Sequence, residues 1–264
     1  MYVIYFQTAI CNGLDTLAKG VHDRKNEIKE LIDGEEGSQA RLEAEAMEQI
    51  SMKLLPSLFK LVDSLHDTSS ESSKKSEADE DNMETEDVVK DSTGVLVVTR
   101  CIAAIAKVAP SAQIQRLFTK VVQKMLASSQ SNDKKLIEKM CSLLALSQAL
   151  VISECLNDSS ISLLYRSLKP IIRTDETPSK IQKRAYKVMA EICKRYHSFV
   201  AEPERLKEVM ELLSSTSATS QVSARFMRLK CMAFVVDGFE NSALVARQVR
   251  EERRSILSCY VDIK

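Results

Sequence analysis

The chain has 264 residues, of which 44% are hydrophobic and 28% are charged, as in ordinary soluble proteins. Its six glycines, five prolines and 5% of aromatic residues disfavour strand-rich folds, which need turn glycines and aromatic strand residues. The formal net charge of zero hides a split, because residues 1–92 carry a net charge of −11 and residues 93–264 one of +11. This asymmetry predicts an acidic segment beside a basic binding surface.

Residues 1–65 are expected to form N-terminal helical repeats. The apolar start, MYVIYFQTAICNGLDTL, lacks the positive n-region and the small-residue cleavage site of a signal peptide, so a buried helix is favoured. Residues 40–65 are predicted to be the first helix of a helix pair. No apolar stretch approaches the ~20 residues of a membrane span, and no membrane partner is expected.

Residues 66–92 are predicted to be a disordered acidic insertion in the turn of that helix pair. The segment 67–92 holds ten acidic residues and three lysines, but no leucine and no aromatic residue. Such a segment buries too little apolar surface to offset the entropy lost on ordering. Insertions of this kind lie on one face of a helical-repeat array, often the functional face.

Residues 93–264 are predicted to be a basic helical-repeat array. First helices are expected at 111–127 and at 203–214. A further first helix is expected to end near residues 170–172, before a polar turn. Second helices are expected to begin near 93, 134, 180 and 222, at intervals of 41, 46 and 42 residues. This period matches HEAT and armadillo arrays. The sequence thus predicts an all-α, HEAT/armadillo-like solenoid of about four to five helix pairs, with an irregular helical bundle as the alternative.

The common motifs of catalysis and cofactor binding are missing from the sequence: it has no GxSxG, P-loop, GxGxxG or HExxH. The three histidines, His22, His66 and His197, are isolated. The seven cysteines form no CxxC pair, and most lie among apolar residues, where cysteine packs as a small hydrophobe. We therefore expect no catalytic residues, no cofactor and no metal, and a reducing compartment.

Cations gather on one face of the helix that is predicted to start near residue 180. At 100° per residue they fall within an arc of about 120°; they are Lys180, Lys183, Arg184, Lys187, Lys194 and Arg195. The opposite face is apolar and consists of Ile181, Ala185, Val188, Met189 and Ile192. The pattern predicts an amphipathic helix with an almost entirely positive polar side.

The cations also repeat between helices. Alignment of Leu136, Ile181 and Val222 as the first core positions places Lys139, Arg184 and Arg225 at one equivalent position, and Lys187 and Arg228 at another. Stacked repeats would line these residues into a ladder that binds RNA or a protein partner. An alternative of equal weight is that these cations form packing contacts between adjacent repeats. No aromatic residues are expected between the cations for base stacking, so any RNA contact would be to phosphates.

Three consecutive segments of the chain resemble the ribosomal RNA-processing protein 12 family, which consists of large HEAT-repeat proteins of eukaryotic pre-ribosomes. They are KMLASSQSNDKKLIEKMCSLLALSQALV (124–151), LLYRSLKPIIRTDETPSKIQKRAYKVMAEIC (163–193) and SSTSATSQVSARFMRLKCMAFVV (214–236). The family is much longer, so the chain resembles an internal fragment. The tail after Phe239 departs from the regular helix pairs and reads as a gene-model or splice artefact.

The resemblance implies a nuclear and nucleolar scaffold that joins small-subunit pre-ribosomes, assists pre-rRNA processing and accompanies subunit export. Its partners would be the pre-ribosomal particle, through rRNA or ribosomal proteins, and nuclear transport factors. A karyopherin-like transport receptor and a cytosolic HEAT-repeat scaffold are the alternatives. The net charge of +11 on residues 93–264 favours the first function, because transport receptors are usually acidic.

Overall fold

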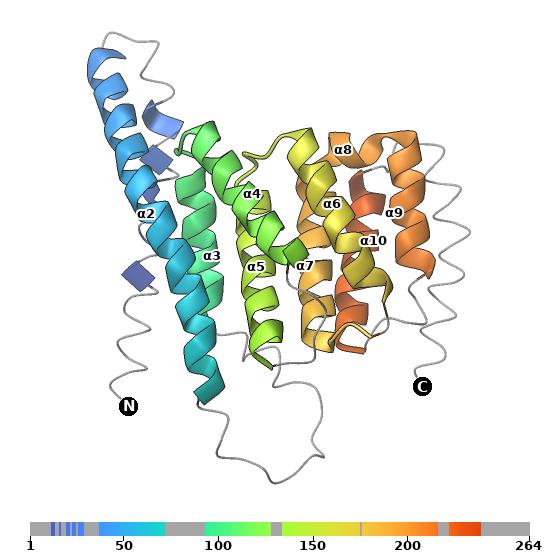
Figure 1. Ribbon diagram of the computed structural model, residues 1–264. Coiled ribbons are helices and arrows are strands. Elements are labelled where there is room, and N and C mark those ends of the chain that lie inside the picture. The colour runs from blue at the N-terminus through green and yellow to red at the C-terminus, as the bar shows by residue number, and fades with distance from the viewer. Residues whose placement is uncertain are drawn as a thin grey trace. The chain divides into compact units, whose positions relative to one another are not determined.

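The computed structural model describes residues 37–71, 93–127, 134–174, 176–215 and 222–238, together with scattered residues between 12 and 28. Figure 1 shows that the regular elements of this part of the chain are helices, and no strand occurs in it. The prediction of an all-α protein is confirmed. Within the same residues, no helix is long and apolar enough to cross a membrane. The chain divides into two compact units, residues 1–160 and 161–264, a boundary that the sequence did not indicate.

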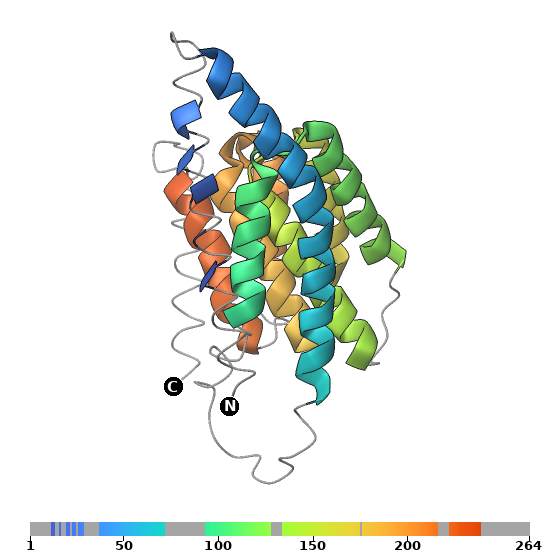
Figure 2. The ribbon, with the colours of Figure 1, turned by 90° about the vertical axis from the view of Figure 1, so that its left-hand side faces the viewer.

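The first unit contains the helices α2 (Gly37–Glu71), α3 (Thr93–Ala106), α4 (Ser111–Ala127) and α5 (Lys134–Ile152). Helices α2 and α3 lie side by side in two perpendicular views (Figure 1, Figure 2), and α5 packs against α2, α3 and α4. Residues 140–147 of α5 are all buried, as expected for a helix that neighbours enclose. The core around it includes Leu55, Val62, Ile102, Ile105, Phe118 and Val122.

A proline inside α2 is compensated by a side chain of α4. Pro56 has no N–H to donate to the carbonyl of Met52, four residues earlier, so the helical hydrogen bond at that carbonyl is lost. The Gln113 side chain fills this place, because its Nε2 donates to the Met52 carbonyl oxygen at 3.2 Å. The long helix therefore continues through the proline, and the same bond ties α4 to α2.

The second unit contains most of α6 (Asp158–Arg173), followed by α7 (Ser179–Arg195), α8 (His197–Ala201), α9 (Pro203–Ser215) and α10 (Val222–Gly238). Helix α7 packs against α10 and α8, and α9 packs against α8 and α10. A buried polar side chain links α6 and α7. Gln182 of α7 is buried, and its Nε2 donates to the carbonyl of Ile172 near the end of α6 at 3.4 Å. This bond satisfies a carbonyl that the helix end leaves without an intrahelical donor.

The predicted helix starts agree closely with the structure. Second helices were expected near 93, 134, 180 and 222, and they begin at Thr93, Lys134, Ser179 and Val222. The first helices expected at 111–127 and 203–214 are α4 and α9, and α6 ends at Arg173. The short helix α8 was not predicted, since five residues carry too little periodicity to be recognised.

Helix α2 extends six residues, about 1.7 turns, into the predicted acidic insertion. Residues 66–71, HDTSSE, belong to α2, because no glycine or proline stops the helix after Leu65. The rest of the predicted insertion, residues 72–92, lies outside the described residues. The same holds for the apolar start, residues 1–11, and for the tail from residue 239 onwards.

Candidate nucleic-acid interface

Helix α7 holds most of the predicted binding residues, and its start is set by a proline. Pro178 precedes the helix with φ −52°, and its carbonyl accepts hydrogen bonds from the N–H groups of Ile181 and Gln182 at 2.9 and 3.0 Å. Pro178 itself lies just before the helix, where its missing N–H costs nothing. The predicted apolar face is confirmed, since Ile181, Ala185, Val188, Met189 and Ile192 are all buried.

The six predicted cations of α7 differ in their exposure. Lys180 and Lys194 are exposed, whereas Lys183, Arg184, Lys187 and Arg195 are half-buried. Arg195 is committed within the helix, because its Nε donates to Glu191 Oε2 at 2.9 Å. Arg184 and Lys187 also interact within the chain. The charge that is most accessible to a partner therefore lies at the two ends of the helix.

The predicted ladder of Lys139, Arg184 and Arg225 is divided between the two units. Lys139 is exposed on α5 in the first unit. Arg184 and Arg225 lie in the second unit, on the packed helices α7 and α10, and both are half-buried. The alignment of Lys139 with the other two residues stays a prediction. Arg184 and Arg225, in contrast, lie on two helices that pack against each other.

Arg228 was predicted to belong to the binding face, and this prediction was wrong. The residue is 4% exposed, and its Nη1 donates to the carbonyl oxygen of Leu213 at 2.9 Å. Leu213 lies in the last turn of α9, so the guanidinium caps the C-terminal end of that helix. Its positive charge also interacts favourably with the negative end of the helix dipole. At 100° per residue, Arg228 lies within 40° of Ala224, Val235 and Met232, all of which are buried, so it lies on the packed side of α10.

An aromatic ring lies between cations of α7 and α10, contrary to the expectation that aromatic residues are missing there. Lys194 Nζ of α7 is 5.6 Å from the centroid of Phe234, and Lys230 Nζ of α10 is 5.7 Å from it. Both lysines are exposed and Phe234 is half-buried. The sequence signal was the i, i+4 spacing of Phe226, Lys230 and Phe234 along α10. We call Lys180, Lys194 and Lys230, with this ring, the α7–α10 basic surface.

The contacts between α7 and α10 also give their relative direction. Cys231 Sγ donates to the carbonyl oxygen of Tyr186 at 3.3 Å, and Phe234 contacts Lys194 further along both helices. Because both partners advance together along the chain, α7 and α10 run parallel. Their outer faces therefore present side chains in the same order.

A second cluster of cations and rings lies between α6, α8 and α9. The rings of Tyr165 and Phe199 meet edge to face at 6.2 Å, and Arg205 Cζ is 4.3 Å from the Phe199 centroid. Lys169 forms an ion pair with Glu208, and this hydrogen-bonded ammonium holds the pKa of Glu208 below its ordinary value. Burial and the Glu208 carboxylate raise the pKa of Tyr165. Since a carboxylate balances the charge here, we interpret the cluster as a clamp between helices.

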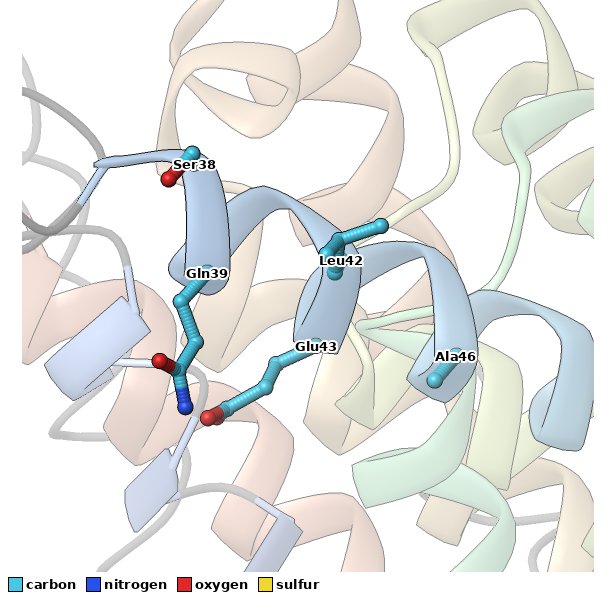
Figure 3. Close-up of a pocket in the computed structure, with 5 residues that line it drawn as sticks. All are labelled: Ser38, Gln39, Leu42, Glu43 and Ala46. Carbon is cyan, nitrogen blue, oxygen red and sulfur yellow. The ribbon is translucent and has the colours of Figure 1, made fainter.

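Other places in the described residues offer little chemistry. Figure 3 shows a shallow hollow along the first turns of α2, with Gln39 and Glu43 extending to the same side of the helix. Its remaining lining residues are Ser38, Leu42 and Ala46. Glu43 already pairs with Arg24, whose Nε donates to Oε2 at 2.9 Å. No group of His, Cys, Asp or Glu that could hold a metal ion occurs in the described part of the chain.

The described cysteines behave mostly as apolar side chains, as predicted. Cys101, Cys141, Cys193 and Cys231 are buried, and Cys155 is half-buried. Burial raises the pKa of the Cys193 thiol to about 12 and that of Cys231 well above its ordinary value. These two thiols therefore stay protonated at neutral pH and are poor nucleophiles.

No known protein-family model matches this chain, and no curated protein sequence matches it. The candidate interface is accordingly defined by the chain's own residues, and it is the α7–α10 basic surface of the second unit. Lys139 is exposed on α5 of the first unit and is considered by itself.

Proposed function

We propose that this chain is a non-catalytic, HEAT/armadillo-like scaffold that binds RNA through the α7–α10 basic surface. The observation that carries the proposal is the exposure of Lys180 and Lys194 at the two ends of α7, where neither forms an ion pair with a carboxylate of the described residues. The helix has six cations and a single carboxylate, Glu191, which is already paired with Arg195. A positive face of this kind attracts a polyanion such as RNA and releases counterions on binding.

The helix packing supports a repeat architecture. Second helices begin at almost equal intervals, and neighbouring second helices pack together in each unit: α3 with α5, and α7 with α10. The parallel course of α7 and α10 is the arrangement that stacked helix pairs produce. In such an array, equivalent positions of successive second helices line one continuous surface.

Exposed lysines support phosphate binding at that surface. Lys180, Lys194 and Lys230 are exposed, and within the described residues none of them forms an ion pair with a carboxylate. The half-buried cations contribute to the local potential without needing direct contact.

The resemblance of three segments to the ribosomal RNA-processing protein 12 family leads us to propose a role in ribosome biogenesis in the nucleus and nucleolus. There the scaffold would assist pre-rRNA processing and the maturation and export of the small subunit.

The test is an RNA titration with the full chain at several salt concentrations. The double variant Lys180→Gln/Lys194→Gln should bind single-stranded RNA more weakly, to a similar degree for unrelated sequences. The slope of log association constant against log salt should decrease by up to about 1.4, since each neutralised phosphate of a single strand contributes about 0.7. The matched control is Lys120→Gln/Lys207→Gln, which removes two exposed lysines from α4 and α9 and should leave the slope unchanged.

Equal slopes for the two double variants would contradict the proposed surface.

The cellular role has a separate test, because a ribosome-assembly scaffold should co-sediment with precursors of the small ribosomal subunit. A chain found only in cytosolic complexes without RNA would instead support the general HEAT-repeat scaffold, and one bound to a transport GTPase would support the karyopherin-like receptor.

A further inference from the structure

One large ring on α10 is exposed without any partner in the described residues. Phe226 is 71% exposed, whereas Phe59, Phe118 and Phe199 are buried. An exposed phenyl ring leaves apolar surface in water at a cost of about 25 cal/mol per Å². Single exposed apolar residues are common, so exposure alone does not define a site. The neighbours of Phe226 give it a specific character.

Phe226 continues the row of rings and cations on α10. At 100° per residue, Lys230 lies about 40° and Phe234 about 80° from Phe226 around the helix, and they are about 6 and 12 Å further along it. Lys194 joins the row from α7 through its contact with the Phe234 ring. The row therefore alternates ring, cation, ring and cation, and we call Phe226, Lys230, Phe234 and Lys194 the α10 strip.

Charge complementarity identifies the partner. Two ammonium groups lie within 6 Å of one ring centroid, and within the described residues neither is paired with a carboxylate. Two ammonium groups beside the same ring concentrate positive charge at this place, and an anion is attracted to it. An exposed ring next to such a site offers a face on which a base can stack. Single-stranded RNA supplies both groups at once, phosphates and unpaired bases, whereas a duplex keeps its bases stacked inside.

We propose that the α10 strip binds single-stranded RNA, with an unpaired base stacked on Phe226 and phosphates held by Lys230 and Lys194. The inference rests on the proposed RNA-binding function and adds the kind of RNA and the mode of contact. It predicts that affinity depends on the bases being present and unpaired, and not only on the number of phosphates.

The chain contains no tryptophan, which makes a direct test possible. The variant Phe226→Trp introduces a single indole at the strip and should bind oligouridine with at least the affinity of the wild type. Its fluorescence should be quenched on titration with oligouridine, because the base stacks on the indole. An abasic ribose-phosphate oligomer of equal length should leave the emission unchanged.

Substitution separates stacking from charge. Phe226→Leu keeps an apolar side chain but removes the ring, and it should weaken oligouridine binding about five-fold or more without changing the salt slope. Lys194→Gln/Lys230→Gln should reduce the salt slope instead. Leu126→Ala, at another exposed apolar residue (64% exposed), is the matched control and should have no effect on binding.

The possible failures can be told apart. Salt-dependent RNA binding that is insensitive to Phe226→Leu overturns the α10 strip but leaves the proposed function standing. Absence of RNA binding in the wild type overturns both. If Phe226→Leu changes the sedimentation coefficient of the chain and not its RNA affinity, Phe226 belongs to a contact with a second copy, and the inference is wrong.

Discussion

Arg228 and Lys230 are two residues apart on α10, yet their environments differ completely. Arg228 is buried and donates to the last turn of α9, while Lys230 is exposed over a ring at the surface. The difference follows from the helix period, because two residues turn the side chain by about 200°. The chemical type of a residue therefore does not decide its role here, and its phase on the helix does.

Replacement of these two residues by methionine should have unequal effects on stability. Arg228→Met keeps the length of the side chain but removes the buried hydrogen bond that Arg228 donates to the Leu213 carbonyl, so the free energy of unfolding should fall by about 1–3 kcal/mol. Lys230→Met should change it by no more than about 0.5 kcal/mol. Urea unfolding followed by circular dichroism measures both. A smaller loss for Arg228→Met than for Lys230→Met would show that the cap contributes nothing.

At the scale of the helix, α7 is buried over a wider arc than its apolar pattern indicates. Besides the predicted apolar face, Gln182, Tyr186, Ala190 and Cys193 are buried. They extend the buried arc to about 200° of the helix circumference. The neighbouring α10 accounts for part of this, since Cys231 reaches the Tyr186 carbonyl. The half-buried state of Lys183 and Lys187 follows, because packing covers the flanks of the positive face.

A charge placed on either side of α7 tests this assignment. Val188→Asp buries a carboxylate without a partner, and the free energy of unfolding should fall by about 3 kcal/mol or more. Lys194→Asp lies at an exposed position and should be nearly neutral. Thermal or urea unfolding of the two variants gives the comparison. Similar losses for both would mean that the helix has a different phase.

The helix starts were predictable because they depend on local signals. Pro178 before α7, Pro203 at the start of α9 and the polar stretch before α5 mark boundaries in any tertiary context. The burial of Arg228 and the meeting of Lys194 with Phe234 depend on which helix lies alongside. A projection of one helix contains no information on its neighbour, and an alignment of repeats assumes that equivalent positions have equal exposure. Those contacts therefore required the packed structure.

At the scale of the whole chain, the charge of zero is the sum of two large opposite parts. The first unit contains the acidic segment 72–92, with eight acidic residues and three lysines, and the second unit contains the α7–α10 basic surface. A chain with a net charge of zero exerts no net attraction on RNA at long range, although its basic surface attracts RNA at close range. The acidic segment should therefore lower the affinity for RNA most strongly at low salt, where the Debye length is greatest.

Replacement of residues 72–92 by a short Gly–Ser linker should leave helicity and the thermal midpoint nearly unchanged. Loop closure depends only on the logarithm of loop length, so the free energy of unfolding should change by no more than about 1 kcal/mol. RNA affinity should rise, by more at 50 mM than at 200 mM salt. A variant of equal length, in which the eight acidic residues become Asn or Gln, separates charge from length and should reproduce the rise. If only the shortened chain bound more tightly, length and not charge would be the cause. Unchanged affinity in both variants would mean that the acidic segment does not act on the basic surface.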